Sequence, residues 1–115
     1  MLPKANRLHQ DKEIKRLAQT GKTFFLPQLI IKHSDNKEDA VKIGFVISTK
    51  VDKRAVVRNK LARRLREAVK KLLPRIKTGT SVLIIAKKQA LELDFAQLEK
   101  QLDFAFSKIR IYNKD

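Results

Sequence analysis

The sequence predicts an α+β fold, with a single domain over residues 1–115 in which helices pack on one β-sheet. An amphipathic pattern of helical period covers residues 53–73, and a second one begins at Asp94. Three apolar runs have the length and residue types of strands, at 23–32, 41–47 and 80–86. Because helices and strands alternate along the chain, we expect a small sandwich in the order α-β-β-α-β-α.

The first predicted helix covers residues 11–19. Asp11 can cap its N-terminus, and Gly21 can end it. A narrow apolar stripe follows helical spacing and is formed by Ile14, Leu17 and Ala18. A helix this short persists only with tertiary contacts, so we expect the stripe to be covered by the rest of the fold.

Two of the predicted strands lie in the first half of the chain. Residues 23–32 contain Pro27, which lacks an N–H, so this strand lies at a sheet edge or begins after the proline. The polar stretch 33–39 is predicted to be a hairpin loop. Residues 41–47 then alternate with a period of two, and Gly44 leaves room for a close neighbour or a ligand.

The second half contains the clearest helix, residues 53–73, which Pro74 stops. Its apolar residues follow steps of three and four: Val57, Leu61, Leu65, Ala68 and Leu72. Residues 80–86 are β-branched and apolar, which predicts a buried strand. Asp94 and Gln97 have the spacing of a capping box and predict the start of the last helix.

The charge balance points to a polyanionic partner. Lys and Arg number 27 against 12 acids, a net charge of +15, and nucleic acid or an anionic membrane surface could balance it. The chain has no cysteine, which excludes disulfides and thiolate metal sites. No apolar run approaches membrane-spanning length, and residues 1–7 have no apolar signal core. We therefore expect a cytoplasmic protein that does not enter the membrane.

The cations concentrate in residues 50–71, where only Asp52 and Glu67 oppose them. The ten are Lys50, Lys53, Arg54, Arg58, Lys60, Arg63, Arg64, Arg66, Lys70 and Lys71. Helical geometry places most of them opposite the apolar side, but Arg58 falls beside it, so we expect its guanidinium to hang over the sheet. A solvated basic face and a membrane-surface helix are the alternatives. The shortage of Glu partners and the many arginines favour nucleic acid.

Catalytic chemistry by the chain itself is not indicated. His9 and His33 stand alone in polar stretches, the glycines form no phosphate loop, and no set of acids suggests a two-metal nuclease. We expect neither catalytic nor metal-binding residues. Phe24 and Phe25 are adjacent on a strand, so one should point outward, where it could stack a single-stranded base. The alternative is that both are edge-strand packing residues.

The segment 50–67 resembles the signature of the bacterial ribonuclease P protein family, and reads Lys50-Val-Asp-Lys-Arg54-Ala-Val-Val-Arg58-Asn59-Lys60-Leu-Ala-Arg63-Arg64-Leu65-Arg66-Glu67. Asn6-Arg7-Leu8 is similar to the family's opening. The strands on either side of the signature, at 43–48 and 84–87, also resemble the family, so the likeness covers nearly the whole chain in the right order.

This resemblance implies the non-catalytic protein subunit of an endoribonuclease whose RNA removes the 5′ leader of precursor tRNA with Mg²⁺ and leaves a 5′-phosphate on the tRNA. It implies that the Arg-Asn-Arg helix faces the catalytic RNA and that a cleft between that helix and the sheet receives the leader. It also implies a left-handed β-α-β crossover and no required protein partner. The RNA-binding residues would be Arg7, Lys50, Lys53, Arg54, Arg58, Asn59, Lys60, Arg63, Arg64, Arg66 and Lys70, and the leader-cleft residues Ile14, Ala18, Phe24 and Phe25.

Two positions depart from the family's pattern. Lys60 replaces the second arginine of Arg-Asn-Arg, which keeps the charge but loses the planar fork. Ile14 and Ala18 occupy positions where the family usually has phenylalanine, so we expect weak leader discrimination. A small structural protein of the ribosome, or a ribosome-assembly factor, is the alternative function, and composition alone does not separate the two.

Overall fold

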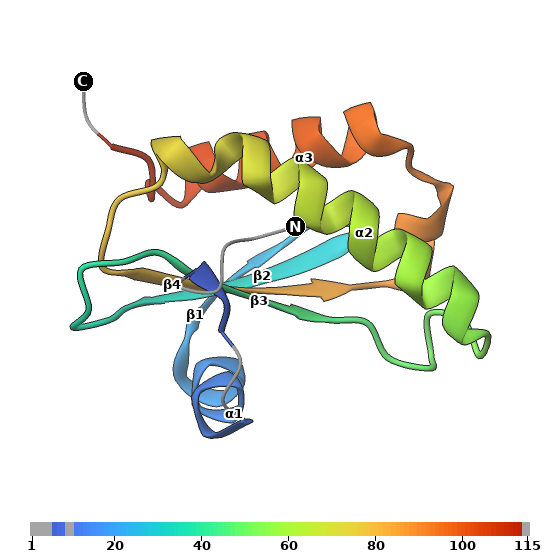
Figure 1. Cartoon of the computed structure of the whole chain (residues 1–115), viewed down its shortest axis with the longest axis horizontal. Helices are drawn as coiled ribbons and strands as arrows, with labels where there is room; N and C mark the ends of the chain where they lie inside the picture. Colours follow the sequence, from blue (N-terminus) through green and yellow to red (C-terminus); the bar gives the residue numbers. More distant parts are fainter. Residues whose placement is uncertain (1–5, 9–10, 114–115) are drawn as a thin grey trace.

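The computed structural model describes residues 6–8 and 11–113 and has three layers, with the sheet in the middle (Figure 1). Helices α2 and α3 cover one face of the sheet, called here the α2/α3 face, and α1 covers part of the other, the α1 face (Figure 1). The elements are α1 (Asp11–Thr20), β1 (Lys22–Phe25), β2 (Leu29–Asp35), β3 (Lys42–Val46), α2 (Ala55–Leu72), η2 (Leu73–Arg75), β4 (Thr80–Ala86), η3 (Lys88–Glu92) and α3 (Phe95–Lys108). The α+β class is confirmed.

The sheet has the strand order β1-β2-β4-β3. β1 and β2 are antiparallel, as are β2 and β4, whereas β3 and β4 are parallel and are joined by α2. β4 is central, and all but one of its side chains are buried, as its apolar composition predicts. The β3–α2–β4 connection is the crossover that the resemblance implies, and its left-handedness stays a prediction.

Two sequence predictions about the strands are wrong. The expected single strand at 23–32 is two strands, β1 and β2, because the chain turns at Pro27, where the Leu26 amide bonds the Leu29 carbonyl at 2.8 Å. The element order is therefore α-β-β-β-α-β-α. The polar stretch 33–39 is not a hairpin loop, because β2 continues to Asp35 and β4 lies between β2 and β3.

Separate apolar clusters hold the two faces. The main core lies between α2, α3 and the sheet and contains residues of every strand except β1 among its fully buried members. The smaller cluster lies under α1 and contains Leu8, Leu17 and Leu83. Gly44 explains the close approach of the N-terminal segment, since a Cβ atom there would lie 3.2 Å from the side chain of Leu8.

The predicted helix boundaries are largely confirmed. Gly21 ends α1, with its amide bonded to the Leu17 carbonyl at 2.9 Å. The capping box of α3 is present, with the Gln97 amide donating to Asp94 Oδ1 at 2.8 Å and the Asp94 amide donating to Gln97 Oε1 at 3.0 Å. α2 begins two residues later than predicted, at Ala55. The predicted cap by the Asp11 side chain lies outside what the structure describes.

Candidate nucleic-acid interface

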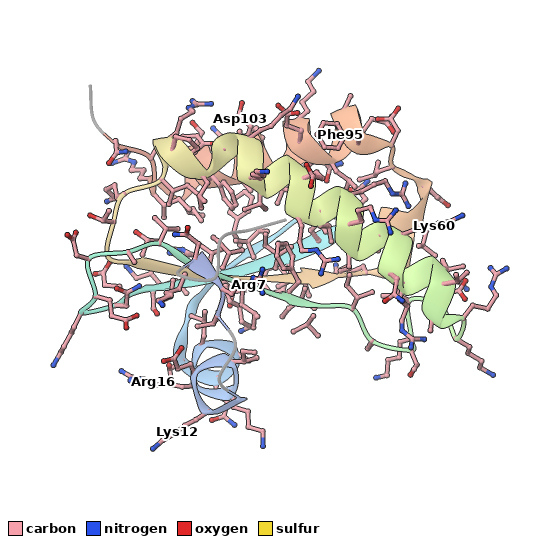
Figure 2. The ribbon with its side chains drawn as sticks, in the orientation of Figure 1. Arg7, Lys12, Arg16, Lys60, Phe95 and Asp103 are labelled. Atoms are coloured by element: carbon pink, nitrogen blue, oxygen red, sulfur yellow. The ribbon has the colours of Figure 1, made fainter. Side chains whose placement is uncertain are left out.

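The outer face of α2 carries the concentrated charge. The helix contains seven cationic side chains and one acid, Glu67, and it buries Leu61, Leu65, Ala68, Val69 and Leu72 toward the sheet. Figure 2 shows Lys60 projecting from α2, while Lys12 and Arg16 project from α1 beyond the other face of the sheet. With the apolar side in the core, the charged side is the one left for a partner, so a membrane-surface role for α2 is disfavoured.

Five cations on and just before this face form what we call the α2 track. They are Lys53, Lys60, Arg63, Arg66 and Lys70, all exposed except the half-buried Arg66. Within the described residues, none of these side chains has a hydrogen bond or ion pair. From Lys60 to Lys70 the track extends about 15 Å along the helix axis. Unpaired cations at this density favour a run of phosphates.

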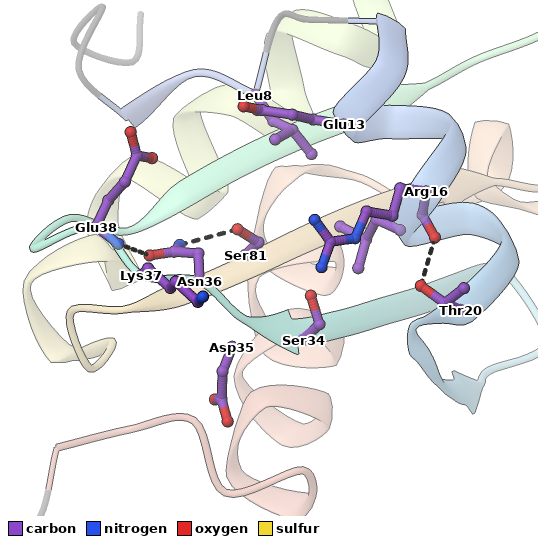
Figure 3. A pocket seen from close by; sticks show the side chains of 11 residues that line it. Leu8, Glu13, Arg16, Thr20, Ser34, Asp35, Asn36, Lys37, Glu38 and Ser81 are labelled. Atoms are coloured by element: carbon purple, nitrogen blue, oxygen red, sulfur yellow. Dashed lines mark hydrogen bonds between the residues drawn. The ribbon is translucent and has the colours of Figure 1, made fainter.

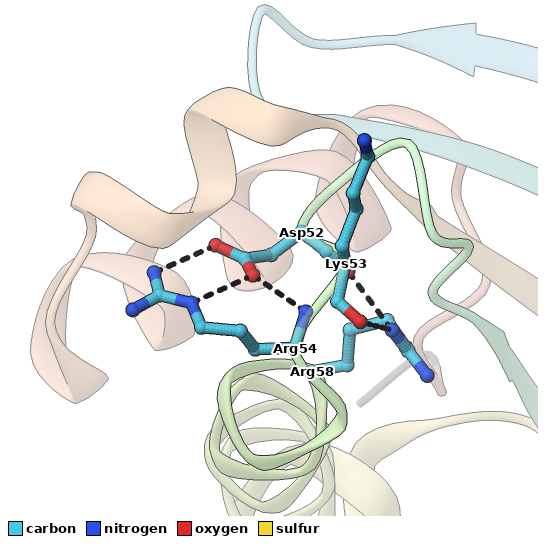
Figure 4. A network of polar contacts seen from close by, with 4 residues as sticks. All are labelled: Asp52, Lys53, Arg54 and Arg58. Atoms are coloured by element: carbon cyan, nitrogen blue, oxygen red, sulfur yellow. Dashed lines mark hydrogen bonds and ion pairs between the residues drawn. The ribbon is translucent and has the colours of Figure 1, made fainter.

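Two arginines of the predicted set instead hold the helix in place. Arg58 Nη1 donates to the carbonyls of Asp52 at 2.9 Å and Lys53 at 2.8 Å, so its guanidinium turns back to the loop before α2 (Figure 4). The expectation that it hangs over the sheet is wrong. Arg64 Nη1 donates to the Leu93 carbonyl at 2.7 Å and so ties α2 to the segment before α3. Both side chains donate to backbone carbonyls outside α2, which ties the helix to the segments around it.

A third arginine is paired with the only acid of the loop before α2. Arg54 Nε and Nη2 lie 3.1 and 3.0 Å from the two carboxylate oxygens of Asp52, whose Oδ1 also accepts the Arg54 amide at 2.8 Å (Figure 4). The side-chain hydrogen bond from Arg54, with its amide, lowers the pKa of Asp52 to about 2. The same pair raises the pKa of Arg54. Arg54 is therefore a weaker phosphate ligand than the sequence suggests.

The start of α2 is open to an anion. Its N-cap residue, Arg54, makes no side-chain cap bond, and the first turn contains no acid. Lys50 lies exposed in the loop before the helix, and Asn59 is exposed on its first turns. Unsatisfied amides and the helix dipole favour negative charge there. Arg7 is exposed, and its backbone forms an isolated parallel β-bridge with Ile43 of the edge strand β3.

The four residues predicted for the leader cleft do not share one site. Ile14 and Ala18 lie on the α1 face, packed on the cluster that contains Leu83. Phe25 is 69% exposed and belongs to the same face by its place in a row of cross-strand neighbours, Phe25, Ile30, Ile85 and Val46. Phe24 points the other way, with its ring 6.4 Å from that of Phe104. The space between α2 and the sheet is filled by the main core, so it is not the cleft that the resemblance implied.

A hollow of about 420 Å³ lies beside α1 (Figure 3), and its lining includes Arg16 and Thr20 of that helix but neither Ile14 nor Ala18. Arg16 projects into it, and Asn36 is fixed there by a 2.9 Å bond from its Nδ2 to Ser81 Oγ. Three acids also line the hollow, Glu13, Asp35 and Glu38. This mixture of charges gives it no clear preference for a polyanion.

The described residues contain neither a membrane-spanning helix nor a cluster of metal-binding side chains. No described helix has both the length and the apolar character needed to cross a bilayer. Within the same residues, no three His, Cys, Asp or Glu side chains gather as a metal site would require. The fold does bring together one cationic group that the sequence analysis missed, Lys22, Lys77 and Arg110, which line one pocket. Their wide separation along the chain leaves no local signal.

Comparisons with known proteins agree with this geometry. The family model for ribonuclease P matches residues 2–110. The ribonuclease P protein component of Chloroflexus aggregans is 37% identical over 100 residues, covering 86% of this chain and 73% of the relative. That of Picosynechococcus sp. is 37% identical over 101 residues, covering 88% and 87%. The solved structure of the Staphylococcus aureus RNase P protein superposes with a TM-score of 0.85 at 25% identity, covering 96% of this chain and all of that one. The chain therefore belongs to the ribonuclease P protein family.

Proposed function

We propose that the chain is the protein subunit of a ribonuclease P ribonucleoprotein and that the α2 track binds its catalytic RNA. The observation that carries this proposal is the set of unpaired cations along one face of α2, in a chain of this family. Arg63 and Arg66 can each hold a phosphate with a bidentate fork, and Lys60 supplies a point charge. The comparisons give no support to the ribosomal alternative.

The residues behind the track keep it in register with the sheet. Arg58 and Arg64 anchor the two sides of α2 through backbone carbonyls. Asp52 holds the loop before the helix through Arg54. Because the track lies on a rigid helix, RNA binding orders only its exposed side chains and not its backbone, which limits the entropy lost.

We propose that the chain assists removal of the 5′ leader from precursor tRNA in the cytoplasm without taking part in the chemistry. Its positive charge would offset repulsion between the catalytic RNA and the substrate. Because the described acids do not gather as metal ligands, we assign the Mg²⁺ that the resemblance implies to the RNA subunit.

We place the leader on the α1 face, at Phe25, Ile14 and Ala18. The exposed ring of Phe25 offers a surface on which one base can stack. Ile14 and Ala18 of α1 offer no second ring for stacking. Leader binding here therefore depends on one stacking contact and on the attraction between the protein's cations and the phosphates of the leader. Phe24 has no part in this surface, because it packs against Phe104.

Site-directed RNA cleavage tests the placement of the catalytic RNA. The chain has no cysteine, so a single Val56→Cys variant can carry an iron chelate beside the α2 track, since Val56 is 65% exposed. We expect strong cleavage at a few sites of the catalytic RNA. A matched Lys100→Cys variant on the outer side of α3 should cleave weakly, and equal patterns from both positions would contradict the placement.

A further inference from the structure

A second polar pocket, of about 380 Å³, lies where the sheet extends past the C-terminal end of α3. Lys22 pairs with His33 in the β1–β2 register, and Asp35 pairs with Thr80 in the β2–β4 register. His33 and Asp35 are two residues apart on β2, so these side chains share one face of the sheet. Arg110, which follows α3, also lines the pocket. α3 ends and β4 begins at one end of the molecule, whereas α2 begins at the other (Figure 1). The pocket is therefore separate from the start of the α2 track.

The charge of this pocket is one-sided. Lys22, Lys77 and Arg110 line it together with a single acid, Asp35. Among the residues that the structure describes, none of the three cations has a carboxylate partner. The hollow beside α1 differs, because three acids line it. Three unpaired cations around one concavity favour an anion.

Arg110 has a backbone conformation that arginine rarely adopts. Its φ is 60°, and it ends α3 through bonds from the Arg110 amide to the Ser107 carbonyl at 3.2 Å and from the Ile111 amide to the Phe106 carbonyl at 3.3 Å. Glycine is the preferred residue at this position of such a helix end. An arginine kept in a strained position suggests that its side chain has a function there.

The remaining walls are fixed before any ligand arrives. The Lys77 amide donates to the Ile111 carbonyl at 2.8 Å, which holds two of the cations on one backbone frame. Thr80 is 4% exposed and brings a hydroxyl to the pocket. Burial, and next the charge of Lys22, lowers the pKa of His33 against the opposing effect of Asp35. A neutral imidazole there offers one N–H donor.

We propose that this pocket binds a phosphate group of an RNA strand, as a second contact in addition to the α2 track. Cations, a hydroxyl and an imidazole are ligands for phosphate oxygens. No Phe, Tyr or Trp is among the described residues that line the pocket, and the half-buried imidazole of His33 is its one aromatic ring, so the lining favours a phosphate over a stacked base. The site deepens the proposed function without depending on α2, because it uses no residue of α2 and lies at the end of the fold away from the start of the track (Figure 1).

Inorganic phosphate tests the pocket directly. The chain has two histidines, and His33→Gln identifies the imidazole NMR signal of His33. We expect phosphate to shift that signal and to raise the pKa of His33, because a bound anion favours the imidazolium. Arg110→Ala and Arg110→Gly should weaken phosphate binding equally, at least several-fold, and Arg110→Lys should weaken it less.

The same variants separate binding from folding. Arg110→Gly should melt at a higher temperature than Arg110→Ala, because glycine adopts a positive φ without strain. If phosphate affinity follows the melting temperature instead of the side-chain charge, or if phosphate leaves the His33 signal unmoved, the proposal is wrong.

A second arm identifies the source of the phosphate. For a Lys77→Gln/Arg110→Gly variant, the log–log salt slope of catalytic-RNA binding should decrease in magnitude by about 0.7 to 0.9, the value for one phosphate contact. If the slope is unchanged although inorganic phosphate shifts the His33 signal of the wild type, RNA is not the partner, and the pocket binds a small phosphate compound. A Lys60→Gln/Arg63→Gln variant is measured in parallel. Its salt slope tests RNA binding by the α2 track separately from RNA binding by the pocket.

Discussion

Replacing Lys60 and Arg63 together by glutamine should lower affinity for the catalytic RNA by roughly 15- to 30-fold at 0.15 M salt. Each phosphate contact contributes about 0.7 to 0.9 to the log–log salt slope, depending on whether the RNA is single- or double-stranded. If the five cations of the α2 track each contact one phosphate, they predict a slope of about −3.5 to −4.5. The double variant should reduce its magnitude by about 1.4 to 1.8.

The structure makes this pair a clean perturbation. Both side chains are exposed and, among the described residues, make no hydrogen bond or ion pair. The free energy of unfolding should therefore change by no more than about 0.5 kcal/mol. Fluorescence anisotropy with labelled catalytic RNA, from 0.05 to 0.4 M salt, gives the slope.

A matched control removes the same charge elsewhere. Lys37 and Lys100 are exposed in the β2–β3 loop and on α3, so Lys37→Gln/Lys100→Gln should leave the slope nearly unchanged. If the two double variants lose the same slope, the RNA responds to net charge alone, and the argument for a track on α2 is refuted.

Other perturbations test the parts behind the track. Arg58→Ala should lower the free energy of unfolding by about 1–2 kcal/mol in denaturant titrations, because two backbone carbonyls lose their donor; a change near zero would contradict its anchoring role. Leu65→Ala should lower it by about 2–5 kcal/mol, since Leu65 is fully buried. The pKa of Asp52 is held below its ordinary value by Arg54, so its stabilisation is present above about pH 4 and lost as the pH falls through about 2. The stability difference between wild type and Asp52→Asn should therefore close over that range, and a constant difference would oppose this. Ala18→Phe should improve cleavage of precursors with long leaders relative to short ones, and no effect would remove the leader site from α1.

Local patterns predicted the helices well. The 3.6-residue period of α2 and the capping box of α3 depend on neighbours within one or two turns, so the sequence contains all the information they need. The strand at 80–86 was also predicted, because only a central strand buries both of its faces. Pro27 predicted either an edge strand or a strand that begins after it. β2 does begin after it, at Leu29, but the separate strand β1 before the proline was not predicted.

Long-range pairing could not be predicted in the same way. No local pattern shows that β4 inserts between β2 and β3. Pairing with β4 extends β2 to Asp35, so the stretch 33–39 is part strand and part loop. The roles of Arg58 and Arg64 also depend on distant carbonyls, of which Leu93 is 29 residues away from Arg64. Helical geometry sorted the charges by direction, but only the folded structure separates cations bound to the protein from cations open to RNA.

The central claim is that this chain assists a catalytic RNA, and one measurement tests it most directly. Precursor-tRNA cleavage by a bacterial ribonuclease P RNA should be measured at low Mg²⁺ with wild-type chain, with Lys60→Gln/Arg63→Gln, and with no RNA. We predict strong stimulation by wild type, a higher protein concentration for half-maximal stimulation by the variant, and no cleavage by protein alone. Tight, salt-sensitive RNA binding without any stimulation would contradict the account.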